Sequence, residues 1–226
     1  MNDILTDVLV IGSGMGGLTA ALKLQQKGKK VMIVEQHSIP GGYCTNFKRK
    51  GFTFDSSIQR LPGCLPGGTI GDILNDLKID TNDLFVELPE LYTWKNSNIS
   101  VLIEPDLKNF IHNISNAFPN EEKNIKKYFN RYVPLMKFMN AWARSTVLGK
   151  IILMLTKTKS LIDLLLHMNK TVKQVFKRYF IDDNVKDVLY SLAYFGLPAE
   201  KMSFCIYLAG SMPLLIEGAH YPKGGS

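Results

Sequence analysis

The fold of this chain is decided by Val8-Leu9-Val10-Ile11-Gly12-Ser13-Gly14-Met15-Gly16-Gly17, in which four apolar residues run into the pattern Gly-x-Gly-x-x-Gly. A helix-like segment follows, and a second apolar run, Val31-Met32-Ile33-Val34, then ends in Glu35. Strand, glycine turn, helix, strand and acid in this order are typical of the βαβ unit that holds a dinucleotide by its pyrophosphate and its ribose. The sequence therefore predicts an α/β fold that begins with a Rossmann-like βαβ unit over residues 3–36.

Each glycine of the pattern has its own physical task. We expect Gly12 to allow the sharp turn out of the strand, Gly14 to let the backbone approach a pyrophosphate, and Gly17 to let the helix pack closely against the strands. The free N–H groups at the start of that helix, together with its dipole, favour a phosphate there. Glu35 follows Gly17 by 18 residues. That spacing is close to the usual offset of about 20, so we expect its carboxylate to bind ribose hydroxyls and to disfavour a 2′-phosphate.

Composition narrows the class of protein. The 226 residues are 46% hydrophobic, which is enough for one or two domains with a core. The N-terminus has no apolar segment of the signal-peptide kind, and the three cysteines are odd in number, far apart and without metal-ligand spacing. We therefore predict a cytoplasmic protein without a metal site. The uncharged run from Met202 to Ile216 has 15 residues, a length that no other run exceeds and fewer than the roughly 20 that cross a bilayer.

The net charge of +7 is concentrated in one region. From Lys137 to Arg178 there are nine Lys or Arg residues and one acid, Asp163, interleaved with aliphatic runs such as Ile151 to Leu155. This pattern predicts amphipathic helices with cationic rims, which suit an anionic membrane surface, so we expect peripheral membrane contact through residues 137–178. A solvated helical face explains the same pattern. Nucleic acid is not expected as a partner, because no nucleic-acid motif accompanies the charge.

The rest of the chain divides into stretches of different character. In order, we expect a loop-rich Gly/Pro stretch at 37–70, a short helix at 71–77, two short strands at 91–94 and 99–103, helices across 119–195, an apolar helical segment at 199–216 and a turn-rich tail at 217–226. The first part favours ligand binding, and the helical part favours contact with apolar partners.

Three regions are therefore predicted. They are an N-terminal cofactor-binding part at 1–75, a mainly helical substrate-binding and membrane-facing region at 76–216, and a loop at 217–226 that leads back to the first part. Because the sequence stops in a glycine loop, we expect an incomplete fold, either the N-terminal part of a longer enzyme or a truncated reading frame.

A second glycine pattern follows the acid, in Glu35-Gln36-His37-Ser38-Ile39-Pro40-Gly41-Gly42. A simple NAD-binding fold does not need this Gly-Gly pair, which extends the phosphate-binding surface. With this pattern, the chain resembles the phytoene desaturase, carotenoid isomerase and retinol saturase group of FAD-dependent oxidoreductases. The segments that carry the resemblance are Asp7 to Ala21, Glu35, Gly41-Gly42-Tyr43-Cys44-Thr45, Gly51-Phe52-Thr53-Phe54-Asp55, Phe195-Gly196-Leu197-Pro198 and Gly218 to Ser226.

The resemblance implies FAD as the cofactor and a set of residues that bind it. The first glycine loop would face the pyrophosphate, the acid would hold the adenosine ribose, the Gly-Gly pair would flank the phosphates and the ribityl chain, and the tail would approach the flavin side of the substrate cavity. These residues are Gly12, Ser13, Gly14, Gly16, Gly17, Glu35, Gln36, Gly41, Gly42, Lys223, Gly224 and Gly225. In such proteins later strands complete the fold, so a missing C-terminal half is an expected partner.

The chemistry implied is hydride transfer to or from FAD on a long isoprenoid or polyene, by saturation, desaturation or isomerisation. The sequence identifies no catalytic residue. His220 and Tyr221 are candidate proton donors, although packing within a loop is their more ordinary role. The aromatic residues Phe52, Phe54, Tyr194 and Phe195 are interpreted as ordinary core rather than as a polyene tunnel. Two alternatives stay open: an NAD-dependent dehydrogenase, and a non-catalytic fragment that binds membranes.

Overall fold

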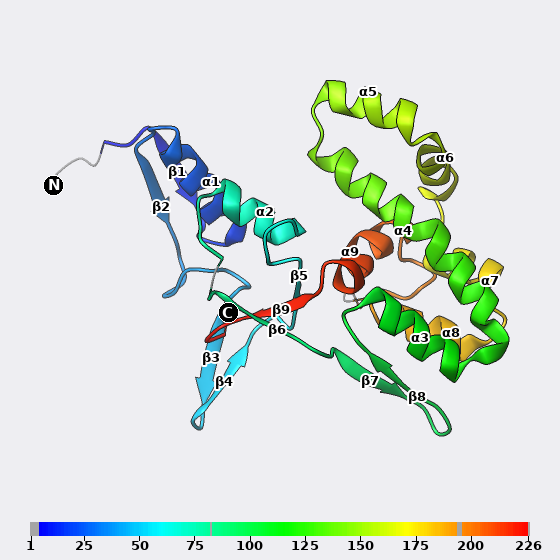
Figure 1. Ribbon diagram of the computed structural model, residues 1–226. Helices are drawn as coiled ribbons and strands as arrows, with labels where there is room; N and C mark the ends of the chain where they lie inside the picture. The colour runs from blue at the N-terminus through cyan, green and yellow to red at the C-terminus, as the bar shows by residue number, and fades with distance from the viewer. Residues whose placement is uncertain (1–4, 82, 194–195, 226) are drawn as a thin grey trace. The chain divides into compact units, whose positions relative to one another are not determined.

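The computed structural model describes residues 5–81, 83–193 and 196–225, which form two compact units. Unit 1 comprises Met1–Glu87 and Ala219–Ser226, and unit 2 comprises Leu88–Gly218 (Figure 1). These units divide after residues 87 and 218, whereas the divisions expected from the sequence, after residues 75 and 216, stay a prediction. The predicted combination of an α/β N-terminal part with a largely helical region is confirmed.

Unit 1 begins with the predicted βαβ arrangement. Strands β1 (Val8–Ile11) and β2 (Val31–Val34) are parallel, with Val8 opposite Val31 and Ile11 opposite Val34. Their β-branched residues favour extended backbone. Helix α1 (Met15–Gln26) joins them and ends shortly before Gly28, whose φ of +79° is typical of a glycine that follows a helix.

The stretch expected to be a loop contains a β-hairpin. Strands β3 (Asn46–Arg49) and β4 (Phe52–Asp55) pair in antiparallel register. They are joined by Lys50 and Gly51, whose φ values are +50° and +83°. Two consecutive residues with positive φ make the kind of tight turn that matches the twist of a hairpin. The loop-rich stretch predicted over residues 37–70 therefore contains a hairpin that was not predicted.

The tail is also more regular than expected. Strand β9 (Ala219–Pro222) lies between β5 (Leu61–Pro62) and β6 (Phe85–Glu87), antiparallel to both (Figure 1). The turn-rich loop predicted for 217–226 is thus a strand over its central residues, because partners distant in sequence supply its hydrogen bonds. Helix α2 (Thr69–Asp76), expected at 71–77, completes the described elements of unit 1.

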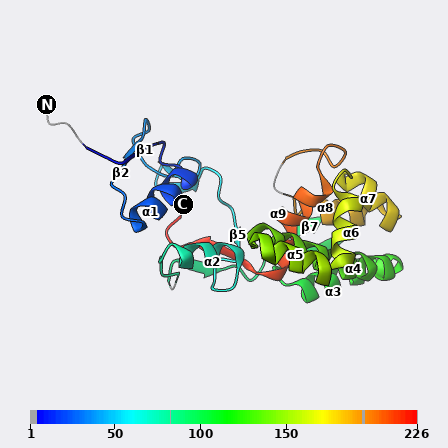
Figure 2. The ribbon, with the colours of Figure 1, turned by 90° about the horizontal axis from the view of Figure 1, so that it is seen from above.

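The described part of unit 2 is mainly helical, as predicted, and contains one hairpin. The hairpin consists of β7 (Tyr92–Lys95) and β8 (Ser100–Ile103). The helices are α3 (Leu107–Ala117), the 3₁₀ turn η1 (Pro119–Glu121), α4 (Glu122–Arg144), α5 (Val147–Thr156), α6 (Thr158–His167), α7 (Val172–Tyr179), α8 (Asp183–Tyr190) and α9 (Phe204–Ile216). Both α5 and α6 contact α4, and Figure 2 shows them beside it from above.

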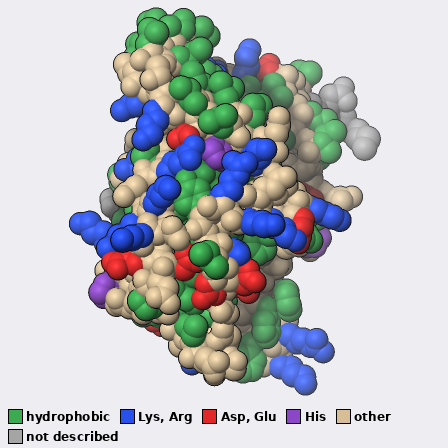
Figure 3. All heavy atoms as spheres, turned by 90° about the vertical axis from the view of Figure 1, so that its right-hand side faces the viewer, with side chains coloured by type: hydrophobic (Ala, Val, Ile, Leu, Met, Phe, Trp, Pro, Cys, Tyr) green, Lys and Arg blue, Asp and Glu red, His purple; other side chains and the backbone are tan. Residues whose placement is uncertain are grey.

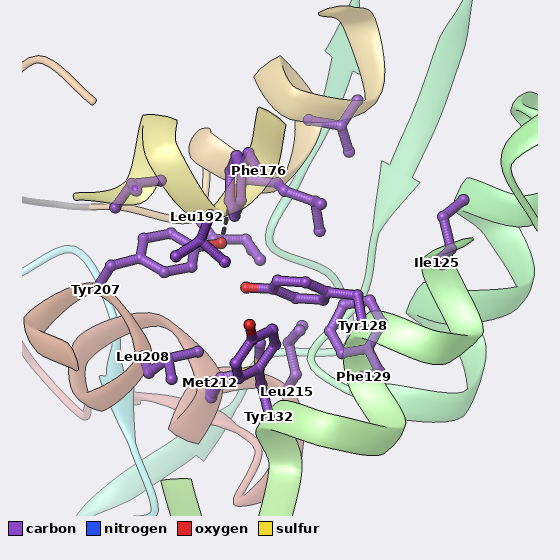
Figure 4. Packing of buried hydrophobic residues seen from close by; sticks show 14 of the residues in the cluster. Ile125, Tyr128, Phe129, Tyr132, Phe176, Leu192, Tyr207, Leu208, Met212 and Leu215 are labelled. Carbon is purple, nitrogen blue, oxygen red and sulfur yellow. Dashed lines mark hydrogen bonds between the residues drawn. The ribbon is translucent and has the colours of Figure 1, made fainter. Parts of the chain in front are cut away.

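The core of unit 2 is rich in aromatic side chains. Tyr128 and Tyr132 of α4 point toward Phe176 of α7 and Tyr207 of α9, and all four are buried (Figure 4). The Tyr207 hydroxyl donates to the Leu189 carbonyl at 2.6 Å. The Tyr128 and Phe176 rings meet edge to face, with centroids 5.8 Å apart, a geometry that aromatic pairs prefer. This packing holds α4, α7 and α9 together.

The aromatic residues of β4 do not belong to a core. Phe52 and Phe54 are 69% and 45% exposed, so their interpretation as ordinary core was wrong. Phe47 of β3 stacks on Phe54 across the hairpin, with ring centroids 5.3 Å apart, and is itself exposed. Tyr194 and Phe195 lie outside the described residues.

Candidate functional site

Three segments of unit 1 meet at the carboxyl ends of β1 and β2. They are the glycine loop at 12–17, the acid segment at 35–36 and the Gly-Gly pair at 41–42. A hollow of about 460 Å³ lies at this edge, lined by Ile11, Gly12, Val34, Glu35 and Gln36. In parallel α/β sheets, ligands bind outside the carboxyl ends of the strands, so this is the position at which a ligand is expected.

The loop is shaped by the absence of side chains. Gly12 has a φ of +95°, which lets the chain turn sharply after β1. A Cβ at Gly17 would lie 2.1 Å from the carbonyl oxygen of Gly12, a distance that no side chain tolerates. The expected close packing of the helix at Gly17 is therefore present, although its nearest neighbour is the loop itself.

The two glycine segments approach each other backbone to backbone. A Cβ at Gly42 would lie 3.0 Å from the Cα of Gly14, and one at Gly14 would lie 4.0 Å from the Cα of Gly42. Gly41 donates its N–H to the Ser13 carbonyl at 2.9 Å, which ties the second segment to the first. The backbone surface they form carries no side chain at Gly14, Gly41 or Gly42, as close approach of a diphosphate requires.

Helix α1 starts at this surface. Its N-cap residue, Gly14, provides no side-chain cap, and no acidic residue occupies the first turn. The first N–H groups of a helix have no acceptor within the helix and carry its positive partial charge. A Cβ at Gly16 would meet nothing within 4 Å, so this part of the first turn faces open space. The helix start can therefore receive an anion.

Glu35 is turned toward the loop. Its Oε2 accepts hydrogen bonds from the amide and the hydroxyl of Ser13, both at 2.7 Å, and its Oε1 accepts one from the His37 amide at 2.9 Å. The His37 bond, followed by those from Ser13, lowers the pKa of Glu35 to about 2. The carboxylate is therefore ionised at every physiological pH, which disfavours a second anion such as a 2′-phosphate beside it.

This geometry changes the role expected for Ser13. Its amide is bound by Glu35 rather than left bare for a phosphate. Of the roughly four lone-pair positions of this carboxylate, three accept the bonds above, and the Gln36 backbone also contributes to its lowered pKa. Ser13 thus anchors the acid against the loop, and the first-turn amides of α1 are what a phosphate would meet.

The tail residues lie elsewhere in unit 1. Lys223 donates its backbone N–H to Leu84 at 2.9 Å, and its Nζ lies 3.1 Å from an oxygen of Asp83. A Cβ at Gly225 would lie 3.3 Å from an oxygen of Asp55, at the base of the β3–β4 hairpin. The described contacts of Lys223 and Gly225 do not join the Gly12–Gly42 cluster, so the role of the tail in binding a cofactor stays a prediction.

The two candidate proton donors lie on β9 rather than in a loop. His220 is only 3% exposed, pairs with Leu61 and Glu87 through its backbone, and has no hydrogen-bond partner at either ring nitrogen among the described residues. Tyr221 is next to it, opposite Val86. Within the described ranges, no three His, Cys, Asp or Glu side chains gather closely enough to hold a metal ion.

Comparisons with known proteins agree with this geometry. Residues 10–77 match the family of NAD(P)-binding Rossmann-like domains. The chain is 28% identical to the all-trans-retinol 13,14-reductase of Homo sapiens over 239 residues, which cover 97% of this chain and 37% of that protein. It is 32% identical to the chloroplastic prolycopene isomerase of Daucus carota over 144 residues, which cover 60% of this chain and 22% of the isomerase. The resemblance indicated by the sequence motifs is thereby confirmed, for a chain that spans only 22% to 37% of the length of these two relatives.

Solved structures show the same fold. An oxidoreductase of Methanosarcina mazei superposes with a TM-score of 0.57 at 20% identity, over 96% of this chain and 46% of that one. Putrescine oxidase bound to putrescine superposes with a TM-score of 0.61 at 17% identity, over 98% of this chain and 47% of the oxidase. At these identities the likeness is one of fold.

Proposed function

We propose that this chain is the cofactor-binding part of a flavin-dependent oxidoreductase that acts on a long apolar isoprenoid or polyene, such as a carotenoid or retinol. The observation that carries the proposal is the meeting of the glycine loop, Glu35 and the Gly41-Gly42 pair at one edge of the β1–β2 sheet. The similarity to retinol reductases over 97% of the chain supports the choice of substrate class.

The residues present fit FAD. The ionised Glu35 and the hollow beside it suit the hydroxyls of an adenosine ribose. The open first turn of α1 suits the diphosphate. Gly42 allows close approach on the other side. When bound, FAD supplies the hydride acceptor or donor, while the protein binds, orients and excludes water.

Unit 1 has an exposed aromatic surface that suits contact with an apolar substrate. Phe47, Phe52 and Phe54 form an exposed aromatic face on the β3–β4 hairpin. The base of this hairpin lies against Gly225, through Asp55. Exposed aromatic clusters of this kind mark binding surfaces more often than isolated apolar residues do. We propose this face as a wall of the substrate site, whether the reaction is saturation, desaturation or isomerisation.

The proposed location is cytoplasmic, with peripheral membrane contact through residues 137–178, because a polyene partitions into lipid. Helices α5 and α6 support this contact. No residue of α5 is buried, and the exposed aliphatic side chains of the pair include Leu148, Leu155 and Leu165. None of the described helices combines the length and the apolar character that a bilayer crossing requires.

Titration of the 226-residue chain with FAD, followed by flavin fluorescence, tests the cofactor proposal. Val at position 14 would place its methyl groups between Gly14 and Gly42, so Gly14→Val is expected to weaken FAD binding at least about tenfold with the far-UV circular dichroism unchanged. Ala20→Val, an exposed change of similar size on the same helix, is the matched control and should bind FAD like the parent chain. Equal binding by both variants would contradict the proposal.

The two alternatives give different results in the same experiment. An NAD-dependent dehydrogenase would bind NADH in preference to FAD, and its binding would respond to Gly14→Val in the same way. A non-catalytic fragment would float with vesicles without binding either dinucleotide. The Gly41-Gly42 segment, which extends the phosphate-binding surface beyond α1, favours FAD over both.

A further inference from the structure

Unit 2 carries a strongly basic hollow on the surface where α6 packs against α4. Its volume is about 620 Å³. The charged residues that line it are Lys123, Lys126, Lys127 and Arg131 of α4 with Lys159 and Asp163 of α6. Five cationic side chains and one carboxylate thus face a common space.

The carboxylates nearby leave much of this charge unbalanced. Asp163 accepts two hydrogen bonds from Arg131, at 2.6 and 3.0 Å, and Lys126 pairs with Glu122 one turn earlier on α4. Among the described residues, no carboxylate forms an ion pair with the remaining lysines, Lys123, Lys127 and Lys159. Like charges gathered in this way repel each other, so an anion in the hollow would be stabilised by all of them.

The hollow borders an exposed aliphatic surface. On α6, Asp163 and His167 are buried and face α4, whereas Ile162, Leu165 and Leu166 are 56–60% exposed on the other side of the helix. Figure 3 shows this face of unit 2, with hydrophobic side chains at the top, over α5, and Lys and Arg side chains gathered below them. Lys159 lies one turn before Ile162 and two turns before Leu166 on α6, so the cationic hollow adjoins the apolar surface.

We propose that the basic hollow binds the phosphate headgroup of an anionic phospholipid while the exposed aliphatic side chains of α5 and α6 enter the lipid surface. Cations beside an apolar helical face are the combination that interfacial helices use on anionic membranes. Among the described residues that line the hollow, the one aromatic side chain is the half-buried Tyr179, so a lipid fits better than single-stranded nucleic acid, which needs exposed rings for stacking. This inference rests on the membrane contact proposed above and adds its lipid class and its headgroup site, most of which lies outside residues 137–178.

The charge of the hollow is tested with vesicles of phosphatidylcholine alone and of phosphatidylcholine with phosphatidylserine. We expect the full chain to float mainly with the anionic vesicles, and Lys127→Glu with Lys159→Glu to weaken that binding by at least about tenfold, since each cation at such a surface contributes measurably. The matched control is Lys95→Glu with Lys108→Glu, which makes the same change in net charge at two exposed positions of unit 2 outside the hollow. This control should bind like the parent chain.

A second pair of variants tests whether the exposed aliphatic side chains enter the lipid. Leu166 on α6 and Ile206 on α9 are both 57% exposed. We expect Leu166→Asp to reduce binding to both kinds of vesicle and Ile206→Asp to leave it unchanged, with circular dichroism confirming that both variants fold.

The outcomes separate this inference from the broader proposal. Equal losses in the two lysine pairs, or binding that ignores phosphatidylserine, overturn the headgroup site and leave peripheral contact standing. Displacement from vesicles by a single-stranded RNA at equal phosphate concentration overturns the choice of lipid. No flotation with any vesicle overturns both the site and the membrane contact, while FAD binding is measured independently.

Discussion

Replacing Gly17 by Ala tests how the glycine loop is built. The added Cβ would lie 2.1 Å from the Gly12 carbonyl oxygen and 3.2 Å from its carbon, both backbone atoms that cannot rotate away. Relief requires α1 or the loop to move by about 1 Å, and overpacking of this kind costs roughly 1–3 kcal/mol. Alanine also stabilises a helix by about 1 kcal/mol relative to glycine, which hides part of the loss.

Gly16→Ala removes that ambiguity. It adds the same methyl group one residue earlier on the same helix, where nothing lies within 4 Å of the new Cβ. Both variants receive the same gain in helix propensity, so the difference in their free energies of unfolding isolates the clash. We expect Gly17→Ala to be less stable than Gly16→Ala by about 1–3 kcal/mol.

The assay is urea unfolding followed by far-UV circular dichroism. The two tryptophans, Trp94 and Trp142, both lie in unit 2, so their fluorescence reports on that unit and provides an internal control that neither variant should change. Equal unfolding midpoints for the two variants in the dichroism signal would refute the packing of Gly17 against Gly12.

Three further predictions concern single side chains. The pKa of Glu35 is lowered from 4.5 to about 2, so its hydrogen bonds stabilise unit 1 fully above about pH 4.5, and this stabilisation is lost as the pH falls toward 2. Glu35→Gln should abolish this acid-dependent step in unfolding curves measured between pH 2 and 6. A pH profile that the substitution leaves unchanged would be evidence against the role of these bonds. The buried Glu121 carboxylate accepts hydrogen bonds from the amides of Ile181 and Asp182 at 2.5 and 2.8 Å. Glu121→Gln should therefore lower the free energy of unfolding of unit 2 by about 1–3 kcal/mol, measured by tryptophan fluorescence. A change below a few tenths of a kcal/mol would mean that these bonds contribute little. Gly51 has a φ of +83°, and a Cβ there would meet no neighbour within 4 Å. Gly51→Val should therefore lower the free energy of unfolding by about 1–2 kcal/mol through backbone strain alone. No change in urea unfolding followed by circular dichroism would show that the hairpin turn relaxes freely.

The βαβ unit could be predicted because its signals are local. Gly12, Gly14, Gly17 and Glu35 each meet a requirement of neighbouring backbone, and they lie together at one edge of the β1–β2 sheet. The β3–β4 hairpin was missed since its turn is Lys-Gly rather than the Asn-Gly or Asp-Gly pair that marks such turns most clearly.

Other features depend on contacts that no local pattern contains. Strand β9 is short and lies between Gly218 and Lys223-Gly224-Gly225, a composition that predicts a turn, and its partners come from residues 61–62 and 85–87. The charge excess at 137–178 was visible, but three lysines of the basic hollow, Lys123, Lys126 and Lys127, precede it. They join Lys159 only because α6 packs on α4, which a sequence pattern does not state.

The position of β9 has a consequence for biosynthesis. It forms the middle of the β5-β9-β6 sheet, yet it is made after every residue of unit 2. On the ribosome, β5 and β6 are therefore synthesised before the strand that pairs with both of them. Unit 2 can fold around its aromatic core before the β5-β9-β6 sheet of unit 1 has formed. Domains tend to fold as they leave the ribosomal exit tunnel, so β9 joins its sheet in unit 1 only after unit 2 has been synthesised. Nascent chains stalled before Ala219 should therefore expose unpaired edges of β5 and β6, which chaperones can bind.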